Sequence, residues 1–77
     1  MNIPPQPQVM FWLQDAQDRY PCLGQLIYDR GEPYAIPNNP IPAHPRIKLE
    51  AARLEEQSDT TLGLPWFLHR GWVVISS

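Results

Sequence analysis

The chain has 77 residues, which suits one domain with a small core. Its net charge of −2 and its charged fraction of 18% argue against a broad basic surface for nucleic acid or anionic lipid. One cysteine, Cys22, excludes an internal disulfide, and the first apolar run (9–13) is too short for a signal peptide or membrane span. These features predict a cytoplasmic protein with no membrane partner and, with the small size, a bacterial source.

Residues 1–7 are predicted to form an extended N-terminal arm, because prolines 4, 5 and 7 fix φ and remove backbone donors. A helix is predicted for residues 8–20, where apolar side chains recur at helical spacing. The side chains with this spacing are Val9, Trp12, Leu13, Ala16 and Tyr20. Pro21 would end this helix. The alternative is a short strand over residues 9–13.

A β-hairpin is predicted for residues 22–36. Residues 23–28 are rich in strand formers, residues 34–36 supply a second strand, and Gly31 can take positive φ in the turn between them. Pro33 cannot donate to a ladder, so the second strand is expected at an edge or after this residue. Gly24 is a candidate for a bulge.

Residues 37–45 hold four prolines in nine positions and are predicted to be a stiff, extended crossover that wraps the domain. Two P-x-x-P spacings occur in it, which is the pattern of ligands for aromatic grooves. That pattern is weakly specific, and no basic residue stands beside its first copy. The structural interpretation of this segment is therefore preferred.

Residues 46–57 have the highest helix propensity in the chain, and Ile47, Ala51 and Leu54 form a narrow apolar stripe at helical spacing. A second helix is predicted here. The alternation of residues 46–50 also fits a strand, which is the alternative. Residues 58–61 are a polar loop.

Residues 64–75 form the densest apolar stretch and contain two of the three tryptophans. It must be buried against the chain's own elements or a second copy. A break at residues 69–71 predicts two strands, 66–68 and 72–75, or one bent strand. The whole chain (1–77) is thus predicted to be a single α+β domain of order α-β-β-α-β(β). Its small antiparallel sheet of three or four strands would be covered by two helices.

Few residues suit catalysis or cofactor binding. Cys22 with His44 or His69 is the only thiol–imidazole combination, and no cation adjoins the cysteine. The same three residues show no metal-ligand spacing, and the glycines form no phosphate-binding motif. We therefore expect a protein that is not an enzyme and carries no cofactor or metal, with a Cys22-dependent enzyme as the third-ranked hypothesis.

Protein binding fits the composition best, because tryptophan, tyrosine and arginine dominate interface energies. An interaction, adaptor or inhibitor domain is predicted, which binds another protein or itself as a homodimer. The candidate contact residues are Phe11, Trp66, Trp72, Arg70, Pro40, Pro42 and Pro45. The alternative is nucleic-acid binding by cations beside aromatic rings. These cations are Arg30, Arg46, Lys48, Arg53 and Arg70.

Overall fold

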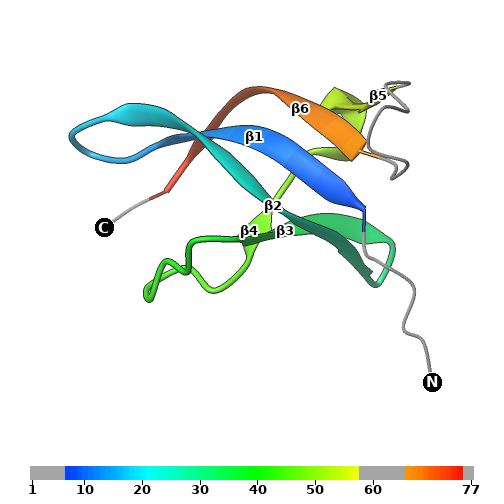
Figure 1. Ribbon diagram of the computed structural model, residues 1–77, viewed down its shortest axis with the longest axis horizontal. Coiled ribbons are helices and arrows are strands. Elements are labelled where there is room, and N and C mark those ends of the chain that lie inside the picture. Colours follow the sequence, from blue (N-terminus) through cyan, green and yellow to red (C-terminus); the bar gives the residue numbers. More distant parts are fainter. Residues whose placement is uncertain (1–6, 58–65, 76–77) are drawn as a thin grey trace.

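The computed structural model describes residues 7–57 and 66–75, which form a six-stranded sheet of order β4-β3-β2-β1-β6-β5 (Figure 1). The β1–β6 pair is parallel and the other neighbouring pairs are antiparallel. The strands are β1 (Gln8–Gln14), β2 (Arg19–Asp29), β3 (Glu32–Pro37), β4 (Ile47–Lys48), β5 (Leu54–Gln57) and β6 (Trp66–Val74). A 3₁₀ turn, η1 (Ala51–Arg53), precedes β5.

The predicted α+β fold is wrong. The described residues contain one 3₁₀ turn and no α-helix, so the protein is all-β with a mixed sheet. In place of three or four antiparallel strands covered by two helices, the described residues form one six-stranded mixed sheet with no α-helix packed on it. No helix in the described ranges has the length and hydropathy needed to cross a bilayer.

The segment predicted as the first helix forms β1, a turn and the start of β2. Buried Val9, Phe11 and Leu13 alternate with less buried neighbours, which is the two-residue period of a β-strand. The strand alternative for residues 9–13 is therefore confirmed. The polar residues of the supposed helix form the turn instead. There Asp15 Oδ1 accepts bonds from the backbone N–H groups of Gln17 at 2.8 Å and Asp18 at 2.7 Å.

Prolines occur inside β2 and β3 because each proline nitrogen faces away from one neighbouring strand, which is β1 for Pro21 and β2 for Pro33. In β2, Leu26 N–H donates to the Pro7 carbonyl at 2.8 Å, so even-numbered residues bond toward β1 and Pro21 points the other way. In β3, the Pro33 carbonyl accepts from Leu49 N–H at 3.0 Å, so Pro33 faces β4. The expectation that Pro33 must lie at an edge or before the strand is therefore wrong.

The predicted hairpin over residues 22–36 is confirmed, with longer strands than expected. Arg30 (φ 54°) and Gly31 (φ 81°) form a two-residue turn with both φ angles positive, as type I′ hairpins require. Gly24 makes no bulge, because the β2–β3 register is continuous. It permits close strand approach, since a Cβ there would lie 2.5 Å from the Ile36 carbonyl oxygen.

The segment predicted as the second helix divides into β4, η1 and β5. Ile47 and Leu49 are 3% and 2% exposed, and their alternation places both in the core. Helix propensity is a weak preference that such burial overrides. Only residues 51–53 turn, where Glu50 Oε2 pairs with Arg53 Nε at 2.6 Å.

The predicted break at residues 69–71 is an irregularity inside one strand, β6. The β1–β6 register shifts between Met10 and Trp12, and Gly71 has φ 88°. A Cβ at Gly71 would lie 2.5 Å from Arg53 Nη1, so glycine both allows this backbone and makes room for the guanidinium.

The sheet is curved (Figure 1), and the core lies on one of its faces, called the inner face below. It is built by alternate residues of β1 to β4 and by Leu49, which follows β4. The buried apolar members are Val9, Phe11, Leu13, Leu26, Ala35, Ile47 and Leu49.

Residues 1–6 of the predicted arm lie outside the described residues. Pro37 ends β3, and residues 38–46, called the proline-rich loop below, join β3 to its neighbour β4. This loop contains a turn in which His44 N–H donates to the Ile41 carbonyl at 2.8 Å.

Candidate functional site

The outer face of the sheet, opposite the core, carries apolar side chains on three adjacent strands. Register places Met10 between Leu23 and Leu68, and Trp12 between Pro21 and Trp72. Partners on neighbouring strands lie about 4.8 Å apart, so the side chains within each row are in contact range. Together with one further residue of β6 they form the outer patch. The outer patch is Met10, Trp12, Pro21, Leu23, Leu68, Trp72 and Val74.

The outer patch is open to solvent. Leu23, Trp72 and Val74 are 56%, 45% and 71% exposed, which is high for large apolar side chains. An antiparallel or mixed sheet with one solvated face normally alternates apolar inside with polar outside. Adjacent exposed apolar side chains on such a face mark an interaction site more often than single ones do.

Trp72 is held in place by two neighbours. Its ring meets Trp12 edge to face, with centroids 5.3 Å apart and planes at 67°. Arg19 Cζ lies 4.8 Å from the Trp72 ring centroid, and Arg19 Nε donates to Gln14 Oε1 at 3.2 Å. The exposed indole is therefore already ordered before any partner arrives.

Charged side chains border the outer patch. Arg19 lies along its β2 side, and Arg70 pairs with Glu55 at 2.8 Å beside Leu68. Both members of this pair are about half exposed or more, so it contributes at most about 1 kcal/mol to stability. An apolar centre with a charged border is the usual anatomy of a protein interface.

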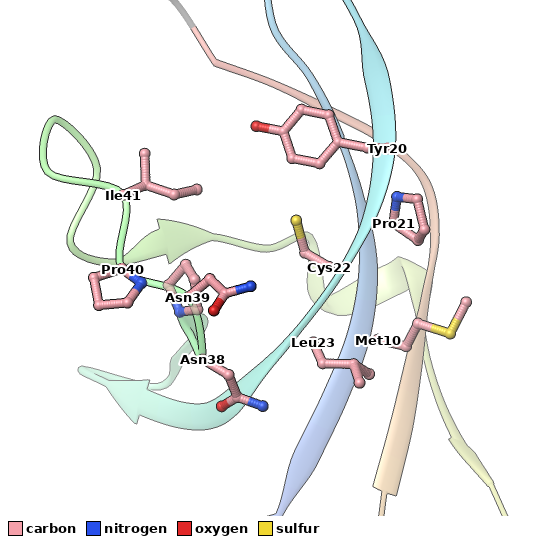
Figure 2. A pocket seen from close by; sticks show the side chains of 10 residues that line it. Met10, Tyr20, Pro21, Cys22, Leu23, Asn38, Asn39, Pro40 and Ile41 are labelled. Carbon is pink, nitrogen blue, oxygen red and sulfur yellow. The ribbon is translucent and has the colours of Figure 1, made fainter.

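A groove of about 630 Å³ lies next to the outer patch. It is lined by Met10, by residues 20–23 of β2, and by residues 37–41, which include the start of the proline-rich loop. In Figure 2, Tyr20 and Cys22 point from β2 toward Pro40 and Ile41. Figure 2 also shows Met10 and Leu23 on the other side of the β2 ribbon, so the groove reaches both faces of the sheet.

The groove has no charged lining. Burial, followed by the nearby Asp15, raises the pKa of the Tyr20 phenol, which keeps it a neutral hydroxyl. Burial also raises the pKa of the Cys22 thiol and lowers its thiolate fraction. The amides of Asn38 and Asn39 complete the polar lining, with Asn38 Nδ2 donating to Gln8 Oε1 at 3.3 Å.

The predicted contact residues are dispersed. Trp72 belongs to the outer patch, with the ion-paired Arg70 at its border, and half-buried Trp66 pairs with Gln8 at the start of β6. Phe11 is 0% exposed in the core, so in the isolated chain it presents no surface to a partner.

The three prolines predicted as contacts separate in the structure. Pro40 lines the groove, while Pro42 and Pro45 are exposed in the proline-rich loop outside it.

Sequence reasoning missed Met10, Trp12, Leu23 and Tyr20. Alternation is the signal that could have found Met10 and Trp12, because residues 10 and 12 point outward when 9, 11 and 13 point inward.

Four of the five cations proposed for nucleic-acid binding have a carboxylate partner. Besides the Arg70 and Arg53 pairs, Arg46 lies 3.0 Å from Asp29, and Lys48 lies 3.1 Å from Glu32. Arg46 also stacks on Tyr34, with Cζ 4.4 Å from the ring centroid. Paired in this way, these side chains contribute little net positive potential.

His69 is the buried polar residue of the core, at 1% exposure. Its Nε2 accepts from the Glu50 backbone N–H at 3.0 Å, so the neutral ring carries its proton on Nδ1, which has no partner among the described residues. Burial lowers the pKa of His69. The nearby Glu50 opposes this shift and Arg53 adds to it. In the described ranges no three His, Cys, Asp or Glu side chains group as a metal site.

Comparison of the chain with protein-family models, with curated proteins and with solved structures gives no match.

Proposed function

We propose that this chain is a non-enzymatic binding module that docks on another protein through its outer patch. The observation that carries the proposal is the apolar outer patch, in which exposed Trp72 packs against half-buried Trp12 on a face where solvated residues are expected. The exposed side chains of Leu23 and Val74 belong to the same patch, in the rows on either side of this tryptophan pair.

The chemistry of the outer patch favours a protein partner. Tryptophan and methionine are enriched in the cores of interfaces, while charged residues are depleted there and gather at the rim. Trp72, held by Trp12 and Arg19, loses little side-chain freedom on binding, which lowers the entropic cost of association. The partner is expected to offer an uncharged apolar surface, with polar groups toward Arg19 and the Arg70–Glu55 pair.

The two competing functions receive less support. The raised pKa of Cys22 reduces its nucleophilic form, and the nominated cations are largely ion-paired. We also propose that binding takes place in the cytoplasm, a reducing compartment suited to one free thiol.

The test is affinity capture from a native lysate with three baits: the wild type, Trp72→Ser and Tyr28→Ser. Tyr28 is 60% exposed but lies near the β2–β3 turn, away from the outer patch, so it is the matched control. We expect a stoichiometric protein on the wild-type and Tyr28→Ser baits that is lost, or reduced at least about tenfold, on Trp72→Ser. Circular dichroism verifies that all baits are folded.

Three outcomes would contradict the proposal. In the first, the Trp72→Ser bait captures the same protein as the wild type does. In the second, capture disappears after nuclease treatment, which indicates that nucleic acid is the partner. In the third, nothing is captured and light scattering shows a Trp72-dependent dimer, which makes a second copy the partner instead.

A further inference from the structure

The groove sits where β2 loses its neighbour. β3 ends at Pro37, opposite Gly24. The last backbone hydrogen bond to this part of β2 is the one that Asn38 N–H donates to the Leu23 carbonyl at 2.9 Å. Residues 19–22 continue beside β1 without a β3 partner. The proline-rich loop turns away from β2 at this point and forms the far wall of the groove (Figure 2).

This edge of β2 is not a template for a further strand. Odd-numbered β2 residues direct their backbone groups toward the β3 side, and at this edge Pro21 has a carbonyl but no N–H. An occupant can donate a hydrogen bond here but receives none from Pro21. Recognition must therefore come mainly from side chains entering the groove.

The lining selects an uncharged, mainly apolar group. None of the lining side chains is charged, and the walls include Tyr20, Pro40 and Ile41. A charged group placed there would lose hydration without an ionic partner. The volume of the groove, about 630 Å³, lies within the roughly 300–1,000 Å³ common for ligand sites.

The groove is continuous with the outer patch. Met10, Pro21 and Leu23 belong to both, because the groove passes around the free edge of β2. A partner that covers the outer patch therefore reaches the groove without crossing intervening residues.

We propose that the groove receives an uncharged apolar side chain of the same partner that covers the outer patch. This inference rests on the proposed function and adds the chemistry of the partner. The outer patch provides most of the contact area, and the groove determines which partner side chain is accepted, as pockets for buried anchor residues do at other interfaces.

The experiment is selection of a phage-displayed library of random peptides on the immobilised wild-type protein. Two loop variants accompany it. Asn39→Asp adds a carboxylate to the groove with little change of shape, and Ala43→Asp adds the same charge to an exposed position of the same loop outside the groove. Cys22 reports occupancy, because it is the only thiol and lines the groove.

We expect enriched peptides to share an uncharged apolar residue and to slow alkylation of Cys22 by N-ethylmaleimide, followed by mass spectrometry. Their affinity should fall at least about tenfold on Asn39→Asp and stay unchanged on Ala43→Asp. They should also compete with the captured partner.

The groove assignment is overturned if no peptide is enriched. It is also overturned if the peptides are charged, leave the Cys22 alkylation rate unchanged, or bind Asn39→Asp as well as the wild type. Each of these results leaves a Trp72-dependent partner, and hence the proposed function, in place. A partner that binds the Trp72→Ser bait as well as the wild type is the separate result that contradicts the proposed function.

Discussion

At the scale of single residues, His69 is the group whose burial has the clearest consequence. Its ring is neutral in the folded protein, with Nε2 bonded to Glu50 N–H. Because burial lowers the pKa of His69 below 6.5, the unfolded chain binds a proton more readily than the folded chain does. Its contribution to stability is therefore present above about pH 6.5 and is lost as the pH falls below this value.

We predict that the free energy of unfolding decreases between pH 7.5 and pH 5.5 and that His69→Gln removes most of this decrease. Glutamine does not titrate, and its oxygen can still accept from Glu50 N–H. Urea unfolding at several pH values measures the effect, with His44→Gln as the control histidine. An unchanged pH dependence in His69→Gln would show that other groups cause the decrease.

At the scale of elements, the β2–β3 pair depends on the small size of Gly24. A side chain there would point toward the Ile36 carbonyl, and backbone atoms cannot move aside as flexible side chains do. The two strands hold the core residues Leu26 and Ala35 opposite each other, so their spacing affects the core directly.

We predict that Gly24→Ala lowers the free energy of unfolding by about 1–3 kcal/mol, the usual cost of overpacking. Gln25→Ala, the next residue on the exposed face, should change it by less than about 0.5 kcal/mol. Denaturant unfolding of both variants provides the comparison. Equal stabilities would mean that the strands separate here without cost.

At the scale of the whole molecule, the two faces of one sheet have different roles. The inner face holds the compact core, and the outer patch remains uncovered although it is also apolar. Side chains that stabilise the fold should therefore be separable from those that bind the partner.

We predict that Phe11→Ala costs about 3–5 kcal/mol of stability, as deletion of a buried aromatic ring does. Val74→Ser should change stability by less than about 0.5 kcal/mol, because this side chain is 71% exposed. Thermal unfolding monitored by circular dichroism measures both. A Val74→Ser variant as destabilised as Phe11→Ala would show that the outer patch belongs to the core instead of to an interface.

The sequence by itself determined the β2–β3 hairpin, because its turn is local: Arg30 and Gly31 adopt positive φ between two strand-forming segments. It also indicated the irregularity near Gly71. Each of these depends on residues that are close together in the chain, and short-range sterics are sufficient to predict them.

Only the tertiary structure decided between helix and strand for residues 8–20 and 46–57. Both segments carry apolar spacing compatible with either period, and β1 becomes a strand because β2 and β6 pair with it on both sides. That pairing also sends Phe11 inward and Trp12 outward, and it brings Trp12 against Trp72. The outer patch and the groove are made from residues far apart in sequence, so no local pattern contains them.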